Sequence, residues 1–252
     1  MRKMGAGPIA VYLVLQGIAA LLTALVTGML LWPLPLGDFR GLILIAAALV
    51  MFYGFMFLVY RLFLFVMPLE EGELAPGSRG EFAAQVNILF YLMVFNTLVR
   101  TNFMPVPLMR LVYLALGAKM GENTYSPGAL LDPPMTVLGA NVLIGHNATL
   151  FAHAIEGNDF FLKKIVVGDN VTIGAQAIVM SGVEIADGAI VSAGAVVRKD
   201  TRIGAGEVWG GCPARLLKAA QPKSERADER AQVSDTRPAP AFSPRPLAAD
   251  FS

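Results

Sequence analysis

The chain has 252 residues and a formal net charge of +1, so its composition gives no indication of a nucleic-acid partner. Hydrophobic residues make up 55% of the sequence, which is high for a soluble protein, and they are concentrated near the N-terminus. The single cysteine, Cys212, excludes an internal disulfide and a multi-cysteine zinc site.

Two long uncharged segments open the chain. Residues 4–37 contain no charged side chain and are long enough to cross about 30 Å of hydrocarbon as a helix. A short polar turn with Asp38 and Arg40 follows, and residues 41–60 are again uncharged. The first segment is too long for a cleaved signal peptide and is followed at once by a second span. We therefore predict an α-helical transmembrane hairpin over residues 1–69.

Positively charged residues flank this predicted hairpin on both outer sides. Arg2 and Lys3 precede the first span, several more follow the second, and the loop between the spans carries only Arg40. This distribution favours a topology with both ends of the hairpin in the cytoplasm. We therefore expect the rest of the chain to face the cytoplasm.

Residues 70–119 are predicted to form membrane-associated helices and a linker. Residues 82–99 are uncharged but contain three amide side chains, Gln85, Asn87 and Asn96. The sequence leaves open whether this segment is a third span, a helix in the membrane interface, or a helix packed on the two spans.

An aliphatic residue recurs every six residues through the second half of the chain. The positions are Leu138, Ile144, Leu150 and, after an interruption, Val167, Ile173, Val179, Ile185, Val191, Val197 and Ile203. Counting back by six gives Asp132, Ser126 and Met120, so the first coil is degenerate. A six-residue aliphatic period is typical of a parallel β-helix, in which three hexapeptides form one triangular coil. We predict this fold for residues 120–219.

The period is interrupted once, between residues 150 and 167, and the break falls within residues 156–164. We therefore predict a loop that leaves the coil immediately after His153. Loops that project from a rigid scaffold often carry function. Phe160 and Phe161 make the predicted tip of this loop apolar, which would suit another subunit, an acyl chain or the membrane.

The coils resemble the C-terminal part of the hexapeptide-repeat acyltransferases, which include galactoside, maltose, serine and xenobiotic O-acetyltransferases. The resemblance is carried by IVVGDNVTIGAQAIVMSGVEIADGAIVSAGAVVRKD and then EVWGGCPARLLK. The preceding LMRLVYLALGAKMGENTY is similar to membrane-attached members that modify bacterial surface polysaccharides and lipids, which implies a location at the bacterial inner (cytoplasmic) membrane. The resemblance covers residues 120–219. It implies an all-β left-handed parallel β-helix behind the helical hairpin, a homotrimer with active sites between subunits, and an acyl-CoA donor, usually acetyl-CoA.

The resemblance also implies a catalytic base, because family members use a histidine just before the projecting loop to deprotonate the acceptor. His153 occupies that place, and the ordinary pKa of histidine suits general-base catalysis near neutral pH. A carboxylate is expected to orient the imidazole, and Glu156 and Asp159 are the two candidates between which the sequence does not choose. The other histidine, His146, is interpreted as an ordinary polar residue of a coil.

Donor-binding positions are likewise implied by the resemblance. The backbone N–H of Ala175 matches the amide that stabilises the thioester oxygen, and the backbone of Ala193 matches a contact with the pantetheine arm. Lys199 matches a lysine near the nucleotide phosphates, with Arg198 and Arg215 as further candidates.

One departure from the family concerns Thr172, which stands where many members have a tryptophan that shapes the cleft. This leaves the acyl group and the acceptor open. The predicted membrane hairpin favours a hydroxyl or amino group on a sugar or a lipid-linked glycan as the acceptor, because a soluble metabolite would not require an anchored enzyme.

Two other functional classes remain possible on this fold. The coils could be a non-catalytic trimeric scaffold of a membrane assembly. Alternatively, γ-class carbonic anhydrases share the fold, but they need three histidines on zinc from adjacent subunits. This chain has two histidines, so we expect no metal. Residues 220–252 are rich in Ala, Pro, Arg, Ser and acidic residues, and we predict that they are disordered.

Overall fold

The computed structural model describes residues 4–35, 37–100 and 104–220. The described helices and strands belong to one compact unit that extends to Ala219. The tail predicted to be disordered lies outside the described residues from position 221 onward.

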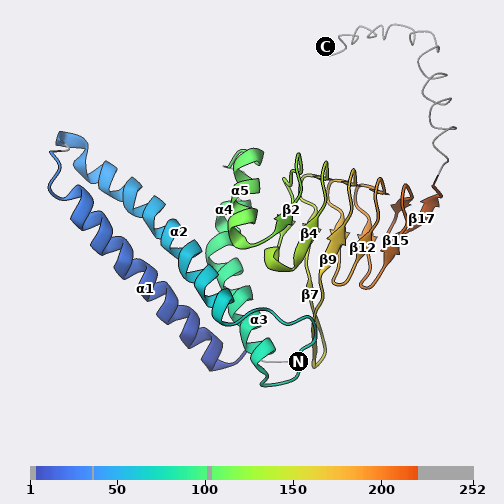
Figure 1. Ribbon diagram of the computed structural model, residues 1–252, viewed down its shortest axis with the longest axis horizontal. Coiled ribbons are helices and arrows are strands. Elements are labelled where there is room, and N and C mark those ends of the chain that lie inside the picture. Colours follow the sequence, from blue (N-terminus) through green and yellow to red (C-terminus); the bar gives the residue numbers. More distant parts are fainter. Residues whose placement is uncertain (1–3, 36, 101–103, 221–252) are drawn as a thin grey trace, which may run out of the picture. The chain divides into compact units, whose positions relative to one another are not determined.

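Two long apolar helices form an antiparallel pair at the N-terminal end (Figure 1). Helix α1 (Ala6–Leu31) is followed by the 3-10 turn η1 (Gly37–Phe39) and by α2 (Arg40–Val66). Within the described ranges, three helices are long and apolar enough to cross a membrane by length and composition: Ala6–Leu31, Gly37–Val66 and Arg79–Arg100. The hairpin geometry agrees with the sequence prediction, whereas its insertion into a membrane remains a proposal.

The third apolar segment differs from the first two because more than half of it is buried inside the protein. It consists of α3 (Arg79–Phe90), the π-helical turn η2 (Tyr91–Phe95) and α4 (Asn96–Arg100). Ser78 caps α3 by accepting a hydrogen bond from the Glu81 amide. The Gln85 side chain accepts a bond from the Gly5 amide, and α3 packs against α1. The segment therefore packs on the hairpin, and its relation to the membrane stays a prediction.

Helix α5 (Val106–Leu116) leads into the coils. It begins after Pro105 and ends at Gly117, whose φ of 107° is a left-handed cap that a glycine adopts without strain. The buried hydroxyl of Tyr113 donates to the Gly128 carbonyl and accepts from the Leu130 amide. These bonds fix the helix on the first coil.

The predicted coils are present as three parallel sheets that the chain visits in turn (Figure 1). The first sheet contains β2 (Lys119–Met120), β4 (Thr136–Leu138), β9 (Ile165–Val167), β12 (Glu184–Ile185) and β15 (Arg202–Ile203). The second contains β5 (Leu143–Ile144), β10 (Thr172–Ile173), β13 (Ile190–Val191), β16 (Val208–Gly210) and the antiparallel β17 (Arg215–Lys218). The third contains β3 (Ala129–Leu130), β6 (Thr149–Leu150), β11 (Ile178–Val179) and β14 (Val196–Val197).

The six-residue period reappears in the backbone at the corners of the coils. Residues with positive φ recur every six positions at Asn170, Gln176, Gly182, Gly188, Gly194, Asp200 and Gly206. This conformation is easiest for glycine and is visited next most readily by asparagine and aspartate. The inward aliphatic side chains are buried, and their stack forms the core of the β-helix. The prediction of a parallel β-helix is therefore confirmed by the pairing of the strands.

The coils stack so closely that some corner positions have no room for a side chain. A Cβ on Gly121 would lie 2.5 Å from the carbonyl carbon of Gly139. We expect Gly121→Ala to destabilise the protein by about 1–3 kcal/mol, because the next coil must move to admit a methyl group. Thermal unfolding of the detergent-purified protein measures this effect. Gly17→Ala in α1 is the matched control, since no atom lies within 4 Å of its added Cβ. Equal melting temperatures for the two variants would contradict the prediction.

Candidate active site

Two departures from the regular coil meet at the corner between the third sheet and the first. The six-residue period assigned Asp132 to an inward position, but the structure places Leu130 there, paired with Leu150. The first coil thus enters the third sheet two residues before the position that the period predicted. The segment from Leu130 to the next inward residue, Leu138, is correspondingly longer than six residues. Asp132 and the 3-10 turn η3 (Pro133–Met135) occupy that extra length.

One coil later the chain leaves the stack at the same corner. Strands β7 (His153–Glu156) and β8 (Asp159–Leu162) form an antiparallel hairpin, and β1 (Gly72–Glu73) pairs with β8 as a third strand. The projecting loop predicted after His153 is therefore this hairpin, and His153 is its first residue. Asp132 and His153, which lie 21 positions apart, are brought together at the corner.

The Asp132 carboxylate holds His153 by three hydrogen bonds to one oxygen. Oδ2 lies 2.7 Å from Nδ1 of His153 and accepts from the amides of Ala152 (2.9 Å) and His153 (3.1 Å). The Asp132 side chain is 1% exposed and the His153 side chain 22% exposed. Such a buried carboxylate fixes both the orientation and the tautomer of the ring, because Nδ1–H must point at the carboxylate. Nε2 is then the ring nitrogen that can accept a proton.

The surroundings of His153 act on its pKa in opposite directions. Burial lowers the pKa of the imidazole, while the hydrogen bond to Asp132 and the negative charge of that carboxylate raise it. The two contributions of Asp132 prevail, so the pKa of His153 lies above its ordinary value. A histidine whose pKa is raised in this way is a stronger base than free imidazole, which suits proton abstraction from an acceptor.

A pocket of about 270 Å³ lies beside the imidazole at the root of the hairpin. Its lining residues come from the corner, the hairpin and the next coil: Phe151, His153, Ala154, Ile155, Glu156 and Met180. The site is thus a partly exposed histidine, backed by a buried carboxylate, on the wall of an open pocket. This arrangement can activate a hydroxyl or an amine that enters the pocket.

The two carboxylates predicted to orient His153 do not contact it in the described structure. Glu156 and Asp159 face each other across the far end of the hairpin, three residues beyond His153, which is about 10 Å along a strand. Glu156 forms an ion pair with Lys199. The residue that bonds to the imidazole is Asp132, which the sequence analysis did not select.

The hairpin also corrects the prediction of an apolar tip. The turn consists of Gly157 and Asn158, whereas Phe160 is buried in the hydrophobic core. Phe161 is partly buried, and the Lys199 ammonium lies 5.4 Å from its ring centre. The two aromatic side chains therefore fix the hairpin on the coil.

The two predicted amide donors lie at a different corner, between the second sheet and the third. Ala175 and Ala193 are exposed there and stack on each other through the bond from Gly194 N to Ala175 O. Among the hydrogen bonds of the described residues, none uses the N–H of Ala175 or of Ala193. At the preceding corner, by contrast, the Ala140 amide donates to the Asp169 side chain. The open amides fit the predicted role as donors to a bound ligand.

The basic residues predicted to contact phosphate are divided between these two corners. Arg198 and Lys199 follow β14 and lie at the corner of His153, while Arg215 in β17 pairs with Gly210 at the end of the second sheet. All three side chains are exposed, and Lys199 is engaged by Glu156. His146 is exposed at the corner of the open amides, where its carbonyl accepts from the Gln176 amide.

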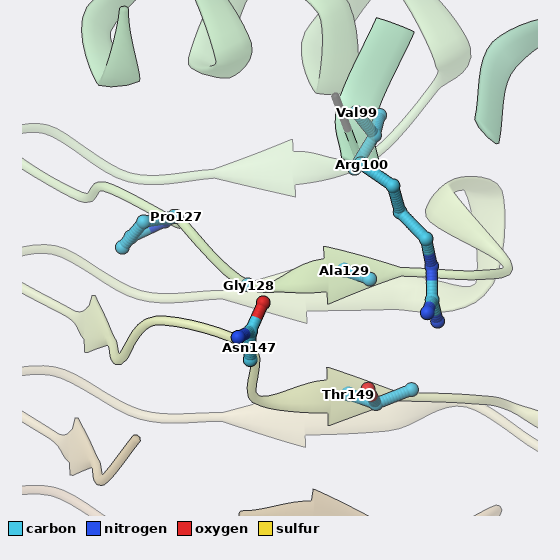
Figure 2. Close-up of a pocket in the computed structure, with 7 residues that line it drawn as sticks. All are labelled: Val99, Arg100, Pro127, Gly128, Ala129, Asn147 and Thr149. Carbon is cyan, nitrogen blue, oxygen red and sulfur yellow. The ribbon is translucent and has the colours of Figure 1, made fainter. Parts of the chain in front are cut away.

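A second pocket, of about 290 Å³, lies over the third sheet where the helices approach it. Figure 2 shows the Arg100 side chain reaching from the end of α4 past Ala129 toward Thr149. Within the described chain, the guanidinium of Arg100 has no hydrogen-bond or ion-pair partner. Thr149 lies on β6, the strand that leads directly to the corner of His153.

One sequence signal could have identified Asp132. The period assigned it to an inward position, where a carboxylate is costly to bury unless it is bonded. A charged residue at a position that requires an aliphatic side chain is therefore a candidate functional residue. The sequence could not show which residue would be its partner.

The coiled region is similar to known proteins. Residues 164–199 match the family model described as bacterial transferase hexapeptide (six repeats), a fold that is a left-handed β-helix. YvoF of Bacillus subtilis, assigned as an acetyltransferase, is 37% identical over 103 residues, which cover 41% of this chain and 59% of that protein. Gamma carbonic anhydrase 1 of Arabidopsis thaliana mitochondria is 42% identical over 83 residues, covering 33% of this chain and 26% of that protein.

Among solved structures, a hexapeptide-repeat acetyltransferase of Vibrio cholerae bound to acetyl-CoA is similar to this chain. It is 25% identical with a TM-score of 0.39, and the match covers 42% of this chain and 62% of that one. The chain thus spans less than two thirds of the length of each of these three proteins. The resemblance to the hexapeptide-repeat acyltransferases is confirmed for the coiled region.

Proposed function

We propose that the protein transfers an acetyl group from acetyl-CoA to a sugar or a lipid-linked glycan, because its coils resemble those of the hexapeptide-repeat acyltransferases. The observation that carries the proposal is the bond between His153 and the buried Asp132 beside an open pocket. No other described histidine has a carboxylate partner.

In the proposed mechanism, Nε2 of His153 takes the proton from the acceptor hydroxyl or amine as the acceptor attacks the thioester carbonyl. Asp132 keeps Nδ1–H oriented and stabilises the imidazolium that forms. The N–H of Ala175 donates to the oxygen that becomes negative in the tetrahedral intermediate. The intermediate then collapses, the carbon–sulfur bond breaks, and the CoA thiolate takes the proton from His153. The products are the acetylated acceptor and free CoA.

The proposed site needs a second copy of the chain. His153 follows β6 and Ala175 precedes β11, so the two residues lie at opposite ends of the third sheet's strands, at different corners of successive coils. A base and an oxyanion donor must lie within about 3 Å of the same reacting group, so the two are supplied by neighbouring subunits. We therefore propose a homotrimer with sites between subunits. A purely monomeric protein in detergent, by sedimentation, would contradict this arrangement.

Phosphate groups of the donor are proposed to contact Arg198, Lys199 and Arg215. Arginine and lysine are the usual partners of phosphate, and all three side chains reach solvent. The ion pair of Lys199 with Glu156 links this contact to the hairpin. Glu156 is thus proposed to act through Lys199, and Asp159 shares the hairpin tip with it.

The acceptor is proposed to be held at the membrane surface. Helices α1 and α2 present long exposed apolar faces, while α3 is largely buried on them. We propose that the hairpin crosses the membrane twice, which keeps the N-terminus and the coils on the same side, and the charge distribution favours the cytoplasmic side. The guanidinium of Arg100, which has no partner within the described residues, lies beside the pocket of Figure 2 and suits a phosphate of a lipid-linked acceptor.

The experiment that tests the proposed function is CoA release by the detergent-purified protein. We expect release from acetyl-CoA that depends on an acceptor from a panel of free and lipid-linked sugars. Binding of acetyl-CoA, measured calorimetrically, is the companion assay and needs no acceptor. Absence of both acetyl-CoA binding and CoA release would overturn the proposal and favour a non-catalytic scaffold.

The same preparation tests the match to a carbonic anhydrase. That class needs three histidines on zinc, and this chain has two. We therefore expect no catalysed CO₂ hydration by the protein after incubation with zinc. Hydration that depends on bound zinc would favour the carbonic anhydrase class over acyl transfer.

A further inference from the structure

The second oxygen of the Asp132 carboxylate accepts a hydrogen bond from a residue of the apolar helices. Oδ1 of Asp132 accepts a hydrogen bond from Nδ2 of Asn87 in α3, at 3.2 Å. Oδ1 of Asn87 in turn accepts from the hydroxyl of Tyr60 in α2, at 2.7 Å. Together with the bond from Asp132 to His153, these contacts form a continuous chain of four side chains, Tyr60–Asn87–Asp132–His153.

The inner members of this chain are sealed from solvent. Tyr60 is 2% exposed, and Asn87 and Asp132 are each 1% exposed. A buried polar group destabilises the protein unless its donors and acceptors form hydrogen bonds. The Asn87 amide meets this requirement, because its oxygen accepts a hydrogen bond and its nitrogen donates one. Its orientation is fixed chemically, because the carboxylate can only accept and the nitrogen must face it.

The two oxygens of the Asp132 carboxylate accept hydrogen bonds from different parts of the protein. Oδ2 has three donors from its own corner, the amides of Ala152 and His153 and the imidazole. Among the described residues, the donor to Oδ1 is Asn87. Without Asn87, Oδ1 would be buried without a hydrogen bond from a described residue, and the carboxylate could rotate about its bond to Cβ.

The segment between α2 and α3 also binds the hairpin of β7 and β8, which begins at His153. The Glu71 carboxylate forms an ion pair with Lys164 at 2.8 Å and accepts from the Lys164 amide. The Leu74 amide donates to the carbonyl of Phe160, and β1 pairs with β8. The histidine is thus fixed from the helical region on two sides, through its carboxylate and through its hairpin.

We infer that Asn87 and Tyr60 are positioning residues for His153, so that the apolar helices form part of the active site and are not merely an anchor. The inference rests on the proposed acetyl transfer. A purely structural role of the two side chains in packing the helices is the competing explanation. The two are separated by kinetic and titration readouts that packing alone would not change.

The experiment compares Asn87→Leu and Tyr60→Phe with matched controls in the full-length, detergent-purified protein. Gln85→Leu removes another buried amide from α3, whose partners among the described residues are Gly5 and Glu81. Tyr91→Phe removes a buried hydroxyl that has no hydrogen-bond partner among the described atoms. Tyr60→Phe changes one atom, so it reports on the chain even if Asn87→Leu fails to fold.

Two readouts are taken for each variant. The first is kcat and KM for acetyl-CoA as a function of pH. The second is the rate at which diethyl pyrocarbonate modifies His153 at each pH, measured by mass spectrometry with His146 as the internal reference. The second readout does not require acetyl transfer, so it tests the chain even if the proposed function is wrong.

We expect Asn87→Leu to lower kcat by about tenfold to a hundredfold, the effect of losing a hydrogen bond to a charged group, with little change in KM. A loosened Asp132 raises the pKa of His153 less, so the lowering effect of burial is less opposed. The pH profile of His153 modification and the acidic limb of the kinetic profile should therefore both move to lower pH. Tyr60→Phe should show a smaller change in the same direction. Both controls should remain within about twofold of the wild type.

Two outcomes would overturn the inference. One is an active wild type with Asn87→Leu and Tyr60→Phe indistinguishable from their controls in both readouts, which leaves the proposed function standing. The other is an inactive wild type in which the pH profile of His153 modification is also the same in all five proteins. An inactive wild type with a shifted profile in Asn87→Leu would reject acetyl transfer but support the positioning of His153.

Discussion

Replacing His153 with alanine is expected to reduce kcat/KM for acetyl transfer by at least about a hundredfold, and up to about 10⁴-fold. This is the range for loss of a general base, because the acceptor must then lose its proton to water as it attacks the thioester. The acetyl-CoA affinity should change little, since the imidazole acts on the acceptor. The measurement is acceptor-dependent CoA release under initial-rate conditions.

The chain supplies its own control for this substitution. His146 is exposed on another corner of the coil and has no described carboxylate partner. We expect His146→Ala to retain the wild-type rate. If His153→Ala retained it as well, the base would have to be another group. A folded His153→Ala protein would show the wild-type thermal transition, which separates loss of chemistry from loss of structure.

Replacing Asp132 with asparagine is expected to lower kcat by up to about 10⁴-fold, the effect seen when the carboxylate behind a general-base histidine becomes an amide. The amide has nearly the same shape, but it cannot stabilise the imidazolium, and its nitrogen can face Nδ1 and select the wrong tautomer. This substitution also leaves the nitrogen of Asn87 without a carboxylate to bond.

The same variant should change the pH dependence in a defined direction. The neutral imidazole is the active form, so activity is lost as the pH falls through the pKa of His153. In the wild type the carboxylate raises that pKa above its ordinary value, against the lowering effect of burial. In Asp132→Asn only burial remains, so the acidic limb of kcat/KM should move to lower pH. An unmoved limb would mean that another group sets the wild-type profile.

The repeating part of the fold could be predicted from sequence because one physical rule acts at every coil. The narrow core accepts an aliphatic side chain every sixth residue, and that period continues from Val167 to Ile203 without a slip. The interruption before Val167 also correctly located a projecting segment after His153. The hairpin of α1 and α2 followed from two uncharged runs separated by a polar turn.

The partner of His153 could not be predicted, because proximity in sequence misleads at a hairpin. Glu156 and Asp159 are close to His153 along the chain, but a strand carries them away from it. Asp132 comes from the preceding coil, and it reaches the corner only because Leu130 enters the third sheet early. The contact with Asn87 spans 45 positions and depends on how a helix packs, which no local pattern encodes.

The corner where Asp132 and His153 meet is also where both coils lengthen. The extra residues leave the ladders beside them undisturbed: β4 pairs with β9 and β9 with β12 in unbroken register. Length at this corner can therefore vary without loss of the core. The fold thus separates a rigid repeat from one column of positions in which insertions cost little stability. New acceptor specificities can arise there by adding or trimming residues, while the stack that holds the site stays the same.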